Sequence, residues 1–232
     1  MLRSPSWSLT WSVLRIVMAA VIIAAIVAQL IASVTRTADS GGDVGTVVVN
    51  FFSFFTILSN LIAAIVLVWA AGSFWRRRPG EPESTALATV LACASTYMVI
   101  TGIVYNTLLR QIVLEQGSLP VPWSNEVLHL IGPLFLFIDV FVGPGRRALR
   151  WSATGAVLAF PIAWVAYTLV RGPLVTNPAS GDAWWYPYPF LNPHNPGGWP
   201  SVVIYVVAIS VAFIVVGAGI VWVGRKRGRH RP

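Results

Sequence analysis

Apolar residues dominate six stretches of this chain, and polar or turn-forming residues separate them. A bilayer hydrocarbon core about 30 Å thick needs about 20 consecutive, mainly apolar residues of helix. Six stretches reach or approach this length, and the last contains no charge from Ser201 to Val223. The pattern predicts an all-α integral membrane protein, a bundle of six transmembrane helices over residues 11–34, 47–74, 86–113, 125–142, 151–170 and 200–223.

The basic residues alternate between the two sides of these helices. They cluster before the first helix and after the second, fourth and sixth, and these clusters contain 13 of the 16 Lys and Arg residues. Arg36, Arg110 and Arg171 fall on the other side. Because cytoplasmic loops carry the excess of Lys and Arg, we expect cytoplasmic N and C termini and an outer loop over 171–199. We expect residues 1–232 to form a single polytopic domain in a cell membrane.

The composition supports a membrane protein and indicates which kinds of partner to expect. Hydrophobic residues make up 56% of the chain and charged residues 10%, against about a quarter charged in soluble domains. The net charge of +8 is compatible with nucleic-acid binding, but the basic residues lie between apolar runs and not on a soluble domain. We therefore expect lipids, and no nucleic acid, as partners. The chain contains no H-E-x-x-H, G-x-S-x-G or Cys/His ligand spacing, so no metal or cofactor is expected.

Polar residues interrupt the second apolar stretch at FFSFFTILSN, positions 51–60. On a continuous helix, Ser53, Thr56 and Asn60 fall within about 60° of one another, because each residue advances about 100°. Such a stripe often forms hydrogen bonds with a neighbouring helix. A second interpretation is that it lines a polar site within the membrane.

The third and fourth helices carry further polar residues. Tyr105 follows Tyr97 and Thr101 at spacings of four on the third helix, and Asn106 and Arg110 come near its outer end. On the fourth helix, His129 is the one histidine within a predicted span. Ionisable side chains inside a membrane are costly and usually face an interior or a wet cavity.

The second and fourth helices both start on the outer side, and this predicts a meeting of two side chains. At 1.5 Å per residue, Thr56 lies about 14 Å and His129 about 6 Å from the outer ends of their helices. A hydroxyl beside an imidazole is the minimum for nucleophilic catalysis. Asn60, Tyr105 and Asn106 are then candidate oxyanion donors. Packing without catalysis is the alternative for the same residues.

Three stretches together resemble a known family. They are FFTILSN on the second helix, VLHLIGPLFLFID on the fourth and YPYPFLNP before the last. Their order and placement are similar to those of the androgen-induced-protein-like membrane family, especially its bacterial branch. Eukaryotic members are threonine hydrolases that cleave fatty acid esters of hydroxy fatty acids. The resemblance implies that Thr56 is the nucleophile and His129 the general base.

The sequence therefore predicts an intramembrane threonine hydrolase that acts on a lipid-like ester. The alternatives are a small-molecule transporter or channel, or a non-catalytic membrane scaffold, that uses the same polar cluster. Arg110 and Arg171 would hold either a substrate carboxylate or a lipid phosphate. The proline- and aromatic-rich outer loop is interpreted either as an interfacial belt or as a stiff cap over an opening between helices.

Overall fold

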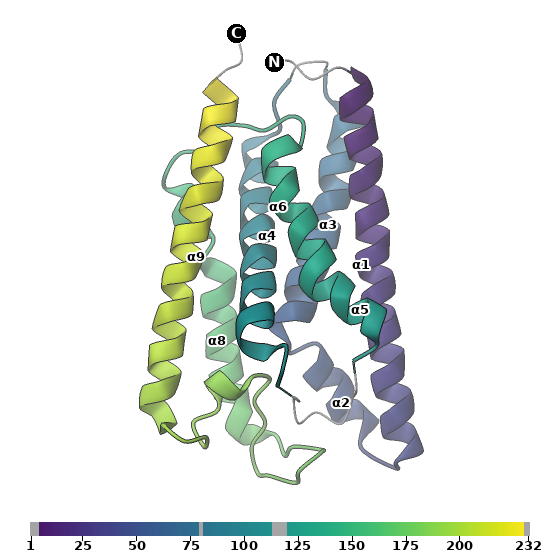
Figure 1. Ribbon diagram of the computed structural model, residues 1–232, viewed down its shortest axis with the longest axis vertical. Coiled ribbons are helices and arrows are strands. Elements are labelled where there is room, and N and C mark those ends of the chain that lie inside the picture. The colour runs from purple at the N-terminus through teal and green to yellow at the C-terminus, as the bar shows by residue number, and fades with distance from the viewer. Residues whose placement is uncertain (1–4, 79–80, 113–119, 230–232) are drawn as a thin grey trace.

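The computed structural model describes residues 5–78, 81–112 and 120–229. Within them, six helices are long and apolar enough to cross a membrane. α1 begins and α9 ends at the same end of the bundle (Figure 1), which we call the basic end. The opposite end, where α2 and the long loop before α9 lie, is the loop end. The helical elements are α1 (Pro5–Asp39), α2 (Val44–Phe51), α3 (Phe55–Arg76), α4 (Thr85–Val104), η1 (Tyr105–Leu109), α5 (Pro122–Glu126), η2 (Val127–Ile131), α6 (Gly132–Val142), α7 (Ala153–Ala156), α8 (Ala159–Arg171), η3 (Gly172–Leu174), η4 (Pro189–Leu191) and α9 (Gly198–Arg229).

The predicted six-helix membrane bundle is confirmed in its helical content and number of spans. α4 lies at the centre and packs against α3, α6 and α9, while α1 packs against α3. Large apolar side chains on the outer surface of the spans are well exposed, for example Ile65, Ile162 and Val215. Such a surface is stable when lipid covers it. The assignment of the basic end to the cytoplasm stays a prediction.

The predicted second helix over 47–74 is wrong as a continuous element. α2 ends at Phe51 and α3 begins at Phe55, and Phe54 between them is extended, with φ −71° and ψ 131°. Ser53 therefore lies in the break and not on a helical stripe with Thr56. Thr56 is the second residue of the α3 span, so the predicted depth of about 14 Å does not hold either.

Side chains from elsewhere compensate the main-chain groups exposed by this break. The Trp164 indole of α8 donates to the Ser53 carbonyl at 2.9 Å. The Phe54 ring packs edge-on against Trp185 and Tyr188 of the long loop. Aromatic burial and a replacement hydrogen bond thus offset the helical bonds that the break removes, as a membrane environment requires. None of these partners is near in sequence, so helical periodicity could not predict the break.

Gly132-Pro133 within the fourth apolar stretch predicts a kink, because proline removes a main-chain donor. The structure has a wide, π-helical turn, η2, just before Pro133. Pro133 has no N–H, and the π register pairs the Gly132 N–H with Val127. Two carbonyl groups of this turn receive side-chain amides instead. Asn60 Nδ2 donates to Leu128 O at 3.1 Å, and Asn106 Nδ2 donates to His129 O at 3.1 Å. The two asparagines therefore connect α3 and η1 to the proline-distorted helix.

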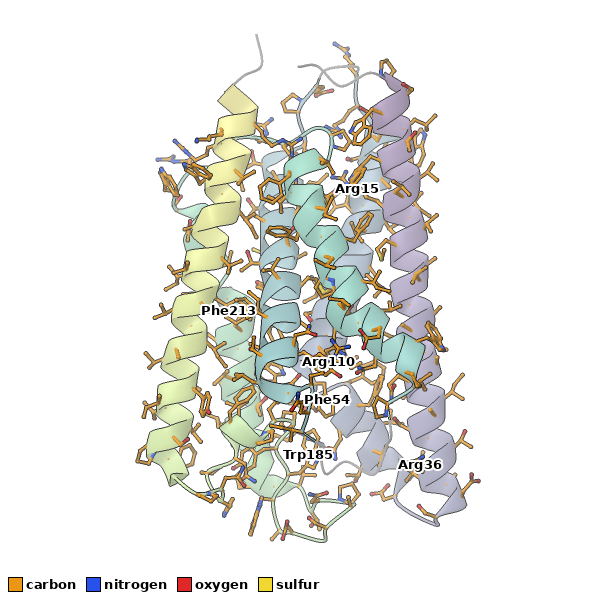
Figure 2. The ribbon with its side chains drawn as sticks, in the orientation of Figure 1. Arg15, Arg36, Phe54, Arg110, Trp185 and Phe213 are labelled. Atoms are coloured by element: carbon orange, nitrogen blue, oxygen red, sulfur yellow. The ribbon has the colours of Figure 1, made fainter. Side chains whose placement is uncertain are left out.

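A buried ion cluster holds the helices together near the basic end. Asp139 of α6 accepts hydrogen bonds from Arg15 Nε at 2.9 Å and from Arg15 Nη2 at 3.1 Å. It also accepts hydrogen bonds from Arg146 and from the Trp11 indole. Glu83 lies 3.6 Å from Arg15 Nη1, and neither side chain of this pair is exposed. Figure 2 shows Arg15 between α1 and its neighbours at this end. From the sequence, Asp139 near the inner end of the fourth helix is expected either to reach the cytoplasmic interface or to pair with an arginine, and the structure shows the pairing.

Several predicted helix ends differ from the observed ends. α1 and α9 extend beyond 11–34 and 200–223, because polar residues at their ends still continue the helix. The predicted helix 151–170 is divided into α7 and α8. Residue 113, the predicted end of the third helix, and the basic residues Arg3 and Arg231 lie outside the described residues.

Candidate functional site

Thr56 lies in the first turn of α3, with its side chain directed to the long loop. Its main-chain N–H donates to the Tyr188 hydroxyl oxygen at 3.2 Å, and its own hydroxyl lies 3.3 Å from the same oxygen. The first N–H groups of a helix have no partner within the helix, so Tyr188 satisfies one of them. Thr56 is 8% exposed, which leaves its hydroxyl at the edge of the protein interior.

Tyr188 is held in place by an aromatic cluster. Its ring stacks on Phe190, with centroids 5.2 Å apart, and packs against Phe54 and Trp164. Burial raises the pKa of the Tyr188 hydroxyl, and hydrogen bonds from Thr56 and the Phe55 main chain lower it by less. The pKa of a free tyrosine is about 10. Tyr188 therefore remains protonated at neutral pH and keeps its hydroxyl hydrogen.

His129 lies in η2 and is oriented by two neighbours. Its ring stacks on Tyr105, with centroids 3.7 Å apart. Its Nδ1 lies 3.0 Å from the Asn125 carbonyl oxygen. Because a carbonyl oxygen only accepts, Nδ1 must carry the hydrogen, and in the neutral ring Nε2 then has the free lone pair. This is the tautomer that a general base needs at Nε2.

The structure does not join Thr56 and His129 directly. Among the described residues, the side-chain partner of Thr56 is Tyr188, and no hydrogen bond links its hydroxyl to the His129 ring. The two segments are nevertheless adjacent. Asn60 Nδ2 bonds both the Thr56 carbonyl, at 2.9 Å, and the Leu128 carbonyl, at 3.1 Å. One asparagine therefore connects the turn that carries Thr56 with the turn that carries His129.

The predicted oxyanion donors differ in whether they have a hydrogen that is not already engaged in a hydrogen bond. Both Asn60 hydrogens and both Asn106 hydrogens are engaged by main-chain carbonyls, because each Nδ2 makes two such bonds. These amides have no hydrogen for an oxyanion. The Tyr105 hydroxyl accepts from Asn125 Nδ2 at 2.6 Å, which leaves the Tyr105 hydrogen to donate.

Arg110 lies beyond this group and is paired. It donates to Asn106 Oδ1 at 2.5 Å and forms an ion pair with Glu126. The side chains of Arg110 and Glu126 are 42% and 38% exposed. Arg110 thus joins η1 to α5 at the loop end and has its own carboxylate partner.

Thr56 is among the residues that line an apolar cavity of about 370 Å³, and His129 is not among them. The walls come from α3, α4, η1, α8, the long loop and α9, and most of the lining is aliphatic or aromatic. The polar part of the lining is Thr56, Thr101, Tyr105, Tyr188 and Ser210. Ile162 of α8, which is 60% exposed, also lines it, so the cavity reaches the lipid-facing side of a span. This volume is within the range of small-molecule sites, about 300–1,000 Å³.

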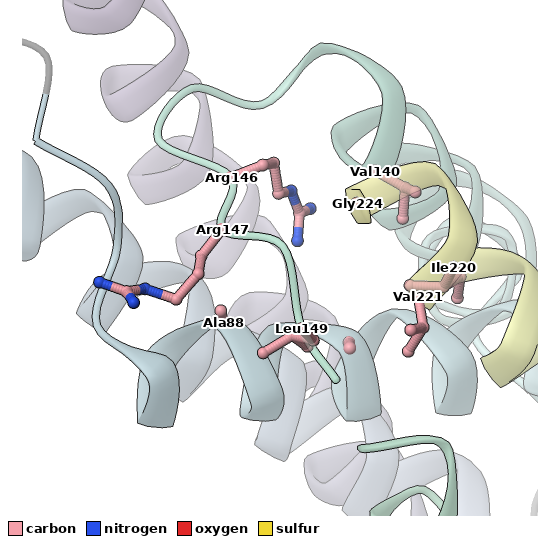
Figure 3. A pocket seen from close by; sticks show the side chains of 9 residues that line it. Ala88, Val140, Arg146, Arg147, Leu149, Ile220, Val221 and Gly224 are labelled. Atoms are coloured by element: carbon pink, nitrogen blue, oxygen red, sulfur yellow. The ribbon is translucent and has the colours of Figure 1, made fainter. Parts of the chain in front are cut away.

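The basic end is packed more tightly. A pocket of about 20 Å³ lies between Ala92, Val140 and Arg146, among other residues (Figure 3). This is room for a single water molecule, which needs about 10–15 Å³. In Figure 3 the guanidinium groups of Arg146 and Arg147 point in different directions. This pocket does not fit an organic ligand.

Sequence reasoning identified Thr56, His129 and Tyr105 as candidates but did not select Tyr188. The long loop was interpreted as either a belt or a cap, and the stretch YPYPFLNP was noted only for its resemblance. Tyr188 and Thr56 are 132 positions apart. The same loop contains Tyr186 and several tryptophans, and nothing in its sequence distinguishes Tyr188 from them.

Comparison with known proteins did not identify relatives: no family model, curated protein or solved structure matched this chain.

Proposed function

We propose that this chain is an intramembrane hydrolase that cleaves lipid-like esters, with Thr56 as nucleophile and His129 as general base. One observation carries the proposal. Thr56 is one of the residues that line an apolar cavity, and this cavity reaches the lipid-facing side of the bundle. A lipid ester diffusing in the bilayer has access to such a cavity. The sequence resemblance to threonine hydrolases supports the same residues.

The chemistry follows the general scheme of nucleophilic catalysis. The Thr56 oxygen attacks the ester carbonyl carbon, and its proton passes to His129 Nε2. His129 then returns that proton to the departing alcohol oxygen as the C–O bond breaks. A water molecule gives one proton to His129, and its oxygen attacks the acyl-threonine carbonyl carbon. The bond from that carbon to the Thr56 oxygen then breaks, His129 returns the proton to Thr56, and the acid is released. Tyr188 and Tyr105, which keep a hydrogen to donate, are suited to stabilise the negative charge on the carbonyl oxygen.

The resting arrangement sets one requirement on this scheme. Thr56 is hydrogen-bonded to Tyr188 and not to His129. Substrate binding must therefore turn the Thr56 hydroxyl towards His129, or a water molecule must carry the proton between them. Catalytic hydrogen bonds are often long or incomplete without substrate, so the observed geometry is compatible with the reaction.

The same geometry favours a second candidate function, the binding of a lipid or another small apolar molecule without cleavage. Thr56 has a stable partner in Tyr188, and the amides of Asn60 and Asn106 serve the main chain. The polar cluster would then shape the cavity and hold the helices together. This candidate predicts ligand binding that survives the loss of the Thr56 hydroxyl.

Labelling with a fluorophosphonate probe distinguishes the two functions. We expect the wild-type protein to form an adduct on Thr56, located by mass spectrometry of the intact chain and its fragments. Thr56→Ala should abolish labelling, Thr56→Ser should retain it, and His129→Ala should slow it by about 10²–10⁴-fold.

Thr101→Ala is the matched control, because Thr101 lines the same cavity and bonds the Ser59 hydroxyl at 3.1 Å. It should label like the wild type. Thermal melting in detergent checks that each variant is folded. Labelling that survives Thr56→Ala, or a wild-type protein that does not label, contradicts the hydrolase and leaves the binding function.

A further inference from the structure

Asn50 and Arg171 meet at the loop end, beside the break in the second span. Arg171, the last residue of α8, donates from Nη2 to Asn50 Oδ1 at 2.6 Å. Its guanidinium group lies over the Trp185 ring, 5.3 Å from the centroid. Asn50 is 5% exposed and Trp185 is 4% exposed. The Asn50–Arg171 pair is therefore enclosed on one side by a buried aromatic ring.

The pair contains two hydrogen-bond donors without an acceptor. Across the described residues, Asn50 Nδ2 and Arg171 Nη1 are buried and have no hydrogen-bond partner. None of the ion pairs in this part of the chain includes Arg171. A buried donor left unpaired costs about 1–3 kcal/mol, and more when it is charged. The positive charge and both free donors call for the same kind of group, a negatively charged oxygen.

We propose that the Asn50–Arg171 pair binds the oxyanion of a membrane lipid, a carboxylate or a phosphate. Guanidinium groups bind the oxygens of both through paired N–H donors. The site lies at the end of a membrane span, where lipid head groups are found. This assignment does not depend on hydrolysis, because it concerns recognition of the charged end of the lipid.

The position of the pair relative to the cavity explains why a lipid fits better than a small free anion. Trp164 and Leu169 of α8 line the apolar cavity, and Arg171 follows them on the same helix. Trp164 and Arg171 are about 10 Å apart along the axis, at 1.5 Å per residue. Phe54 packs against both Trp185 and Tyr188, so it connects the ring beside Arg171 with a ring that lines the cavity. A lipid with its oxyanion at Arg171 can place its chain in the cavity.

Binding of palmitate to the full-length protein in neutral detergent tests this site. 1-Hexadecanol is the matched ligand, since it has a chain of the same length, no charge and no ester bond that the proposed hydrolase could cleave. Phosphatidylglycerol and diacylglycerol, both as analogues with ether-linked chains, form the corresponding phosphate pair. We expect each anion to bind at least about tenfold more tightly than its neutral match, as one charge-assisted hydrogen bond provides, measured by native mass spectrometry and by thermal shift.

Two substitutions remove the preference in different ways. Arg171→Gln removes the charge and should bring palmitate to the affinity of 1-hexadecanol. Asn50→Asp keeps the shape, replaces Nδ2 by an oxygen and supplies Arg171 with a carboxylate partner. It should abolish the preference for the anion and raise the melting temperature of the lipid-free protein. Arg36→Gln and Asn195→Asp are the controls, because both residues are exposed at the loop end, and they should keep the preference.

The outcomes separate the sources of the anion and the two proposals. A preference for palmitate, for phosphatidylglycerol or for both supports the site and identifies the group it takes. Equal affinity for charged and neutral ligands in the wild type overturns it, as does a preference that survives Asn50→Asp. If Arg171→Gln does not fold, Asn50→Asp still decides. None of these ligands contains an ester that Thr56 could cleave, so failure of the hydrolase does not affect this result.

Discussion

The two ends of the bundle differ in how their buried polar groups are paired. At the basic end, two guanidinium groups, Arg15 and Arg146, meet two carboxylates, Asp139 and Glu83. Some atoms there also have no hydrogen-bond partner, but they include both donors and acceptors, such as Arg15 Nη1 and Glu83 Oε1. At the loop end, the unpaired atoms of the Asn50–Arg171 pair are donors only.

The difference indicates which end holds the helices and which end receives a ligand. A cluster of guanidinium and carboxylate groups has its counter-charges within the chain. The pocket beside it has a volume of about 20 Å³. A donor-only pair beside a cavity of about 370 Å³ requires an acceptor from outside the chain. Substitutions at the basic end should therefore change stability, and substitutions at the loop end should change binding.

The largest expected effect comes from Asp139→Ala. Removing one carboxylate leaves Arg15 and Arg146 buried with Glu83 as the remaining acid, and breaking a buried pair costs about 3–5 kcal/mol. We expect a lower free energy of unfolding in detergent and less folded protein on gel filtration. Asp182→Asn, in the exposed part of the long loop, is the control and should stay within about 0.5 kcal/mol. An Asp139→Ala protein as stable as the wild type would show that the cluster does not hold the bundle.

The next largest effect on stability is expected from replacing one alanine with leucine at each end of the bundle. Ala92 is 3% exposed and lines the small pocket, so Ala92→Leu should overpack it and cost about 1–3 kcal/mol. Ala166 lines the large cavity from α8, and Ala166→Leu should stay within about 0.5 kcal/mol. Thermal unfolding of the two variants in parallel measures both. Equal destabilisation would contradict the difference in packing between the ends.

The smallest effect is expected at the exposed ion pair of the loop end. Glu126→Gln removes the carboxylate partner of Arg110, and both side chains are partly exposed. Exposed pairs contribute about 0–1 kcal/mol, so the melting temperature should change little, and less still in high salt. A loss comparable to that of Asp139→Ala would mean that the loop end is also held by charge.

The general fold was predictable because span formation is largely a local property. Each apolar stretch is long enough to satisfy its own main chain as a helix in lipid, so length and hydropathy were sufficient to identify all six. Pro133 likewise predicted a distortion of the fourth span, because a missing N–H acts within the same helix. Helix ends were less predictable, since polar residues continue α1 and α9 beyond their apolar parts.

The candidate residues of the site could be identified from the sequence, but their arrangement could not. Thr56 and His129 stood out as polar residues in apolar segments, but the stripe with Ser53 assumed a continuous helix. The break between α2 and α3 is stabilised by Trp164, Trp185 and Tyr188, which lie on other elements. No local pattern contains these partners.

The amino-acid sequence by itself determined the six spans, their alternating charge and the polar residues that the membrane contains, because each depends on one stretch of chain and its solvent. The tertiary structure decided which of those residues have partners. It paired Thr56 with Tyr188 and Asn50 with Arg171, over separations of 132 and 121 positions. Such contacts depend on how whole helices pack, and that packing is set by side-chain shapes across the bundle.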